Sequence, residues 1–333
     1  MSACSKHDRF DVSVIIPTRN RAGLIGEAIE SALAQTVLPV EVIVIDDGSS
    51  DNTCEVVGKY GDQVLYIRRE GQGEPTASNT GIRAARGRYV ARLDDDDLWL
   101  PDKLEAQSAA LRRVPDAALV FGRMESFRPD GSIHEVWPDA ELPGCEPVPP
   151  AVDDEDAVYL CGPQFVRTLL RRDLIPHSSV LVRRDVLVES GGYDEALPYC
   201  DDWDLWIRIA LAGHRIVYVS RTLYRYRLHG GNMSRRMRIL KEMEFRVILK
   251  TLQNPALPAD MRPQLRRSAA IHAKVLGDRA VAAAEYRTAR RWYTTAMTYG
   301  FRPVQPVSWA LCWAGKPGRR IIRALNPKTE IFS

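Results

Sequence analysis

Two apolar runs on either side of a segment with helical periodicity determine the fold class of this 333-residue chain. Residues 12–16 read Val-Ser-Val-Ile-Ile, and residues 41–45 read Glu-Val-Ile-Val-Ile. Between them, residues 22–35 repeat apolar side chains at the three- and four-residue spacing of an amphipathic helix. Strand, helix and strand at this length form a βαβ unit, which joins parallel strands. The sequence therefore predicts an α/β protein built on a parallel sheet.

The same alternation continues through the first half of the chain. Further strands are predicted at 64–67, 88–93 and 117–121, and further helices at 51–58, 75–85 and 101–113. Pro17 is predicted to break the first strand. Residues 125–160 hold many prolines and acidic side chains with little periodicity, which predicts a long loop or insertion.

Regular structure is predicted to resume near Ser178. The elements expected beyond it are strands at 178–182, 216–219 and 223–227, a helix at 202–212, and a helical region from 235 to about 298 with a helical hairpin at 269–297. The second half is therefore predicted to add short strands before ending in helices.

Four consecutive aspartates, Asp94–Asp97, end the predicted strand at 88–93. Adjacent carboxylates repel one another, so a cation normally lies among them. Oxygen ligands of this kind suit Mg²⁺ or Mn²⁺, which commonly bridge to substrate phosphates. A solvated acidic turn that caps the next helix is the alternative, and the run alone does not decide between them.

Polar clusters follow three of the predicted strands, at 17–21, 46–51 and 94–97. Ligands of open α/β sheets bind beyond the carboxyl ends of the strands, so the three clusters favour one shared nucleotide site. Within the second cluster, Asp46 and Asp47 would accept hydrogen bonds from a base or a ribose, although a turn with a helix cap is an equal interpretation. GxGxxG after the first strand and GxxxxGK[ST] are both absent, which disfavours a Rossmann site and a P-loop.

Two further segments contain candidate catalytic or ligand-binding residues. Asp201 and Asp202 open the predicted helix at 202–212, where they would act either as caps or as a general base for an acceptor hydroxyl. His229 lies among basic residues and beside two glycines. A lone histidine is usually not a ligand, but a loop of this composition could close over a diphosphate.

Charge is distributed unevenly along the chain. Residues 235–333 hold 20 Lys and Arg against 6 Asp and Glu, a net charge of +14, whereas residues 1–234 have a net charge of −11. The basic region is predicted either to pack on the acidic body of the chain or to contact anionic lipid through residues 307–325, which combine tryptophans with Lys and Arg. No recognised nucleic-acid module is present, so a nucleic-acid partner is not expected.

The expected location is the cytoplasm, with peripheral contact at the inner face of the membrane. No apolar run reaches the roughly 18 residues of a membrane span, and residues 1–9 lack the apolar centre of a signal peptide. The six cysteines form no CxxC pair, which disfavours a zinc site or a disulfide framework and fits a reducing compartment.

Six segments, taken in order, resemble the motifs of glycosyltransferase family 2, in particular its non-processive enzymes of the GT-A fold. They are Val12–Asn20, Val42–Asp51, Ala77–Ile82, Leu93–Pro101, Gly191–Asp194 and Asp201–Trp206. Two positions depart from the usual pattern of the family. Ser78 stands where an Arg is frequent, and Asp201-Asp202 stands where Glu-Asp is common.

The resemblance implies a nucleotide-diphospho-sugar donor (a UDP-sugar is favoured), a divalent cation (Mn²⁺ or Mg²⁺) and inversion at the anomeric carbon. The positions it implies for donor contact are Pro17, Thr18, Arg19, Asn20, Asp46, Asp47, Asn79, Asp94 and Asp95. The implied metal ligands are Asp94, Asp96 and His229, and the implied base is Asp202, with Asp201 as the alternative.

The resemblance runs from about Val12 to Ser234, so it implies that residues 1–234 form the catalytic domain. Residues 235–333 lie outside it and are predicted, from their charge and periodicity, to form a basic helical region. Within the first part, the expected pieces are a nucleotide-binding half at about 10–124, an insertion at 125–175 and an acceptor half at 176–234. The implied acceptor is a saccharide or lipid-linked saccharide in cell-surface polysaccharide or glycolipid synthesis. A non-catalytic nucleotide-sugar-binding protein and a sugar nucleotidyltransferase are the alternative functions.

Overall fold

The computed structural model describes residues 11–138, 142–150, 156–230 and 237–301. The chain divides into two compact units, Met1–Asn232 and Met233–Ser333. The division falls two residues before the boundary expected after Ser234, and we describe each unit by itself.

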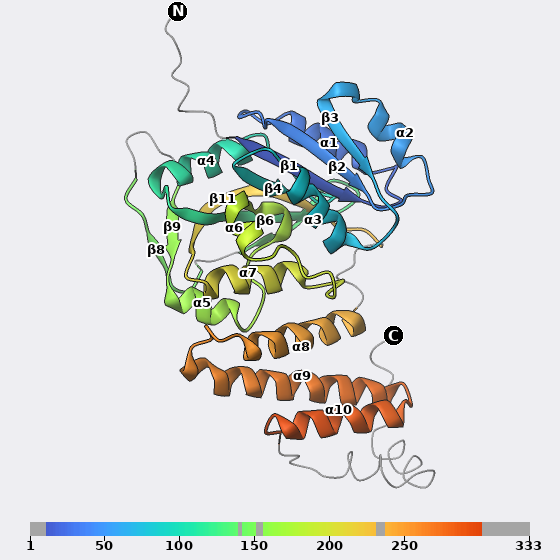
Figure 1. Ribbon diagram of the computed structural model, residues 1–333, viewed down its shortest axis with the longest axis vertical. Coiled ribbons are helices and arrows are strands. Elements are labelled where there is room, and N and C mark those ends of the chain that lie inside the picture. Colours follow the sequence, from blue (N-terminus) through green and yellow to red (C-terminus); the bar gives the residue numbers. More distant parts are fainter. Residues whose placement is uncertain (1–10, 139–141, 151–155, 231–236, 302–333) are drawn as a thin grey trace, which may run out of the picture. The chain divides into compact units, whose positions relative to one another are not determined.

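The first unit is built on a sheet whose first four strands are parallel (Figure 1). They pair in the order β3-β2-β1-β4, and their bounds are Val12–Thr18 (β1), Glu41–Asp46 (β2), Val64–Arg68 (β3) and Tyr89–Arg92 (β4). All seven residues of β1 are buried, as expected of a central parallel strand covered on both faces. The predicted parallel sheet is thus present in the first half of the chain.

Beyond β4 the sheet is mixed. β10 (Leu181–Arg183) runs antiparallel to β4 and to β6 (Ala117–Phe127), while β11 (Arg215–Arg227) lies parallel to β6. The remaining strands pair antiparallel with these or with one another: β5 (Leu98–Trp99), β7 (Ile133–Trp137), β8 (Cys145–Pro147) and β9 (Val158–Cys161). The α/β fold class is confirmed.

Helices cover both faces of the sheet. The helices of this unit are α1 (Ile25–Leu33), α2 (Thr53–Gly58), α3 (Glu74–Ala84), α4 (Lys103–Arg113), α5 (Pro163–Leu169), α6 (Arg184–Glu189) and α7 (Asp201–Leu211), with 3₁₀ turns at Gly61–Gln63 and His177–Ser179. Val14 and Ile16 of β1 pack with residues of α1, α2 and α4. Since side chains alternate along a strand, Ile15 faces the other side, where it meets α3.

Three predictions of local structure were wrong. Pro17 does not end the first strand, which continues to Thr18. Residues 125–160 are not one long loop: β6 extends to Phe127, and strands β7, β8 and the first part of β9 follow. The two short strands expected at 216–219 and 223–227 are one strand, β11, whose pairing with β6 is irregular between Val219 and Tyr224.

Gly81 lets α3 approach the sheet closely. A Cβ atom at this position would lie 2.8 Å from Cδ1 of Ile45 and 2.9 Å from Cγ2 of Ile15, both in buried strands. We therefore expect Gly81→Ala to lower the free energy of unfolding by about 1–3 kcal/mol, measured by urea unfolding. Gly58→Ala at the end of α2 is the control, because nothing lies within 4 Å of its added Cβ. Equal stability of the two variants would contradict this packing.

In the second unit, residues 237–301 form three helices and a 3₁₀ turn. They are α8 (Met237–Gln253), α9 (Arg262–Ala282), α10 (Tyr286–Thr298) and the turn Ala259–Met261. The predicted helical hairpin is present as α9 and α10, which join at Ala284, a residue with φ of +59°. Small residues allow the two helices to approach, since a Cβ on Gly277 would lie 2.8 Å from the ring of Tyr293.

Candidate active site

The segments that follow β1 and β2 lie side by side at the carboxyl edge of the sheet. The backbone N–H of Asn20 donates to Oγ of Ser49 at 2.9 Å, and the N–H of Ser50 donates to Oδ1 of Asn20 at 2.7 Å. Asn20 has φ of +54°, in the left-handed region that asparagine tolerates better than most residues. The expected convergence of the first two polar clusters is therefore present, with Arg19 and Asn20 exposed at the edge and Pro17 and Thr18 buried in β1.

The carboxylates of Asp46 and Asp47 accept hydrogen bonds that fix the loops at this edge of the sheet. Asp46 is fully buried and accepts hydrogen bonds from the backbone N–H of Ser49 at 2.7 Å and from the hydroxyl of Tyr66. Asp47 accepts from the N–H groups of Gln72 at 3.0 Å and Gly73 at 2.7 Å, which lead into α3. Both carboxylates therefore shape the loops of the site.

The side-chain amide of Asn79 also makes hydrogen bonds within the protein. Its amide donates to the carbonyl of Tyr193 at 2.9 Å and to Glu195 at 3.0 Å, and its carbonyl accepts from the N–H of Tyr193 at 2.8 Å. These bonds tie α3 to the turn at Gly191–Tyr193. The structure thus gives Asn79 a positioning role and does not bring it to the predicted donor contacts.

The acidic run divides into two pairs. Asp95 and Asp96 lie beside Arg21, with N–O distances of 3.6 and 3.5 Å. Asp96 also lies 2.9 Å from Nε2 of His229, a residue 133 positions further along the chain. The structure therefore brings together two of the three predicted metal ligands.

Asp97 and Asp94 point to other partners. Oγ of Ser178 donates to Asp97 at 2.8 Å and accepts from the backbone N–H of Asp94 at 3.0 Å. Asp97 also accepts from the N–H of Arg227 at 3.2 Å and is 1% exposed, so it anchors the acidic segment. The Asp94 carboxylate contacts Nη1 of Arg92 at 2.6 Å.

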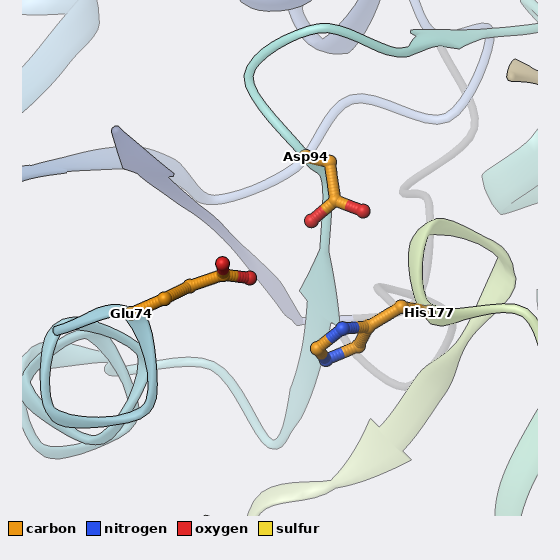
Figure 2. A group of neighbouring side chains, drawn as sticks. All are labelled: Glu74, Asp94 and His177. Atoms are coloured by element: carbon orange, nitrogen blue, oxygen red, sulfur yellow. The ribbon is translucent and has the colours of Figure 1, made fainter. Parts of the chain in front are cut away.

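Figure 2 shows Glu74, Asp94 and His177 converging from three elements. Their ligand atoms lie within 4.8 Å of one another, a grouping of the kind that holds a metal ion. The guanidinium of Arg92, however, contacts all three: Nη2 pairs with Glu74, and Nη1 contacts both Asp94 and Nδ1 of His177. Arg92 is 2% exposed. Because this buried cation supplies the positive charge in the structure, a metal ion at the three ligand atoms would have to displace the guanidinium. Asp94, one of the predicted metal ligands, belongs to this grouping.

His177 is neutral in this cluster. Burial and the charge of Arg92 lower the pKa of its imidazole well below the usual value. Since a guanidinium can only donate, Nδ1 of His177 accepts, and Nε2–H donates to the hydroxyl of Tyr193 at 2.9 Å. Oδ2 of Asp202 lies 3.7 Å from the same Nδ1. Arg92 thus contacts both Asp94 and His177, and Asp202 lies beside His177 without a hydrogen bond to it.

Asp202 and Asp201 occupy different environments at the start of α7. The Asp202 side chain is 18% exposed, and burial raises the pKa of its carboxyl to about 6. Asp201 is 6% exposed, and in the described part of the chain its Oδ2 has no hydrogen-bond partner. Burial and the neighbouring Asp202 raise the pKa of Asp201 well above the usual value. Asp202 therefore loses its proton before Asp201 does.

The donor atoms of Asp96 and His229 fit a hard divalent cation such as Mn²⁺, since carboxylate oxygen suits Mn²⁺ and imidazole is a frequent first-row ligand. Asp95 lies next to them, and burial raises the pKa of its carboxyl to about 8. A carboxyl group that is protonated near neutral pH would regain its charge beside a bound cation. The predicted metal ligands Asp96 and His229, with Asp95 adjacent to Asp96 in the chain, could also hold an ion if Arg21 moved away from the two aspartates.

The family can now be assigned. A model described as "Glycosyl transferase family 2" matches residues 13–170, and one described as "Glycosyltransferase like family 2" matches residues 158–260. The chain belongs to glycosyltransferase family 2. Together the two matches cover the sheet, the acidic run and α7.

Similar proteins come from several bacteria. An uncharacterized glycosyltransferase of Rickettsia felis is 35% identical over 202 residues, which are 60% of this chain and 31% of that protein. The hyaluronan synthase of Pasteurella multocida is 28% identical over 250 residues, 74% of this chain and 23% of that protein. The family 2 chain thus spans less than a third of the length of either relative.

Two solved structures share the GT-A fold with this family 2 chain. Residues 1–349 of TarS from S. aureus in complex with UDP-GlcNAc align with a TM-score of 0.60 and 16% identity, covering 94% of this chain and 92% of that one. The mannosyltransferase PcManGT from Pyrobaculum calidifontis, in complex with GDP-Man and Mn²⁺, aligns with a TM-score of 0.55 and 20% identity, covering 95% and 87%. At these identities the likeness concerns the fold.

Glu74, Arg92 and His177 are not among the site residues predicted from the sequence. Glu74 had one local signal, its position directly after the glycines at 71 and 73, at the start of a helix. Arg92 and His177 had none, because they are 85 residues apart and meet only where β4 lies beside the turn at His177–Ser179.

The membrane prediction falls outside the described residues, since it concerns 307–325. Among the helices that the structure describes, we find none with the length and apolar character needed to cross a bilayer.

Proposed function

We propose that this family 2 glycosyltransferase moves a sugar from a nucleotide-diphospho-sugar to an acceptor hydroxyl, with inversion and with a divalent cation. The observation that carries the proposal is the position of Asp202 beside His177, whose Nδ1 accepts from Arg92, the partner of Asp94. The pKa of the Asp202 carboxyl, raised to about 6, supports a role as base near the acidic run. A protein that only binds nucleotide sugars has no use for such a base.

The proposed base acts on the acceptor. Asp202 takes the proton of the attacking hydroxyl while that oxygen approaches the anomeric carbon from the face opposite the leaving diphosphate. The carbon develops oxocarbenium character, as in other glycosyl transfers. His177 cannot compete for the proton, because Nδ1 already accepts from Arg92. This arrangement supports Asp202 as the acceptor of the proton.

Asp95, Asp96 and His229 are the proposed holders of the cation. A divalent cation bound there would neutralise the charge that develops on the leaving nucleoside diphosphate. Arg21 lies against both aspartates and would keep their carboxylates oriented before the donor enters. Support for Mn²⁺ and for a UDP-sugar comes from the ligands named for the two structures of the same fold.

A saccharide or lipid-linked saccharide of cell-surface polysaccharide synthesis is the proposed acceptor. The support is the likeness to the P. multocida hyaluronan synthase and to the chondroitin synthases of P. multocida and Escherichia coli. A panel of nucleotide sugars tested by thermal shift, with and without Mn²⁺, would identify the donor. At a concentration one hundred times its Kd, a ligand stabilises the folded state by about 2.7 kcal/mol. A panel in which no compound shifts the transition would contradict the proposed donor class.

Asp96→Ala is expected to remove the Mn²⁺-dependent part of donor binding. The variant loses the carboxylate that faces His229, so we expect the Kd of UDP in the presence of Mn²⁺ to rise about tenfold or more. Calorimetric titration of UDP with Mn²⁺ and with EDTA measures the effect. Asp62→Ala, an exposed aspartate in the turn Gly61–Gln63, is the control. If Asp96→Ala still binds UDP better with Mn²⁺ than with EDTA, the assignment of Asp96 is wrong.

A further inference from the structure

The second compact unit contains a cavity of about 380 Å³ between α8, α9 and α10. Each helix contributes one face to it: positions 238, 242, 245 and 246 on α8, positions 276, 279 and 280 on α9, and positions 288, 291, 292 and 295 on α10. Residues three and four apart lie on the same side of a helix, so the three faces turn toward one space. Its size is within the range of cavities that hold small ligands.

Four arginines line this cavity, and only part of their charge is neutralised. Arg238 makes a double ion pair with Glu285, with N–O distances of 3.0 and 2.9 Å, and Arg246 pairs with Glu242 at 3.0 Å. Within residues 11–138, 142–150, 156–230 and 237–301, the guanidinium groups of Arg279 and Arg291 have no carboxylate or hydrogen-bond partner. Two like charges that line one space favour the binding of an anion there.

The same cavity has an aromatic wall. Trp292 and Phe245 both line it and pack edge to face, with ring centroids 5.3 Å apart and an interplanar angle of 85°. Phe245 is buried, while Trp292 is partly exposed. An indole held in this way presents a rigid apolar surface, on which the C–H face of a sugar ring can lie. A guanidinium binds a carboxylate with two parallel hydrogen bonds.

We propose that this cavity binds an oligosaccharide that carries carboxylate groups, with Arg279 and Arg291 on the carboxylates and Trp292 under a sugar ring. The site gives the basic helical unit a purpose separate from that of the acidic catalytic unit. The proposal rests on the proposed function in one respect, because it takes the ligand to be an acceptor saccharide. An inorganic anion would leave the aromatic wall and most of the volume unused.

The test uses the full chain and a tetrasaccharide with two glucuronate units. Its counterpart has both carboxylates reduced to alcohols, and isothermal titration calorimetry measures both Kd values. We expect the acidic tetrasaccharide to bind at least tenfold more tightly than the reduced one. Arg279→Gln and Arg291→Gln should each raise its Kd about tenfold, as for the loss of one hydrogen bond to a charged group.

Arg267→Gln is the matched control for charge. Arg267 is exposed on α9 and lies 12 residues before Arg279, about 18 Å along the helix axis. If Arg267→Gln raised the Kd of the acidic tetrasaccharide equally, the proposal would be overturned, because the net charge of the unit alone would then explain the binding. Equal binding of the reduced tetrasaccharide, tighter binding of inorganic phosphate, or no binding of the acidic tetrasaccharide would also overturn it.

Titration of UDP with Mn²⁺ in the same samples separates this site from the proposed function. Failure to bind UDP with retained binding of the acidic tetrasaccharide would count against a UDP-sugar as the donor and support the cavity. Normal UDP binding in Arg279→Gln, with weakened tetrasaccharide binding, supports both.

Discussion

Asp202→Asn is expected to reduce sugar transfer by about 10²- to 10⁴-fold while leaving the Kd of the donor unchanged. The amide keeps the shape of the carboxylate and its place at the start of α7, but it cannot accept the proton of the acceptor hydroxyl. Steady-state transfer rates and calorimetric donor titration measure the two quantities. Loss of donor binding together with activity would argue against a role as base.

Asp201→Asn is the control for this prediction. The Asp201 carboxyl is buried, and its raised pKa means that it stays protonated when Asp202 is charged. An amide resembles a protonated carboxyl group, so we expect Asp201→Asn to keep most of the activity. The reverse result, an inactive Asp201→Asn and an active Asp202→Asn, would move the base to Asp201.

The pH dependence of transfer follows from the same carboxyl group. A base acts in its deprotonated form, and the pKa of Asp202 is raised to about 6. Transfer should therefore be level above this pH and fall about tenfold for each unit below it. Asp202→Asn should lose this dependence. A wild-type profile that shows no decline between pH 6 and pH 4.5 would contradict the assignment.

Arg92→Met is expected to lower the free energy of unfolding by about 3–5 kcal/mol. The substitution leaves Glu74 and Asp94 facing each other without the cation that both contact. Urea unfolding measures the loss. Arg86→Met removes an arginine that is mostly exposed in its ion pair with Glu41, so we expect a loss of no more than about 1 kcal/mol.

Two further measurements identify the cause of this loss. Glu74→Gln added to Arg92→Met should recover part of the stability, because it removes one of the unpaired charges. In Arg92→Met the two carboxyl groups have raised pKa values in the folded state, so the folded protein binds more protons than the unfolded one. Its stability should therefore rise as pH falls from 7 to 5. A loss that neither Glu74→Gln nor lower pH reduces would point to packing instead of charge.

Local sequence was sufficient for the parts of this protein that depend on neighbouring residues. The alternation of β1, α1 and β2, the acidic run after β4 and the acidic start of α7 all follow from periodicity and from motifs of a few residues. The same motifs led to the family. Strands β7 and β8 escaped prediction because they are short and mostly exposed, so their apolar pattern is weak.

Only the tertiary structure determined which partner each aspartate of the acidic run contacts. The sequence shows four equivalent aspartates, yet Asp94 pairs with Arg92, Asp96 with His229, and Asp97 with Ser178. Ser178 and His229 lie 81 and 133 positions away from their aspartates along the chain, and no local pattern connects them. They meet because β1, β4 and β11 bring their carboxyl ends to one region of the sheet, and because a buried charge is stable only beside a partner that compensates it.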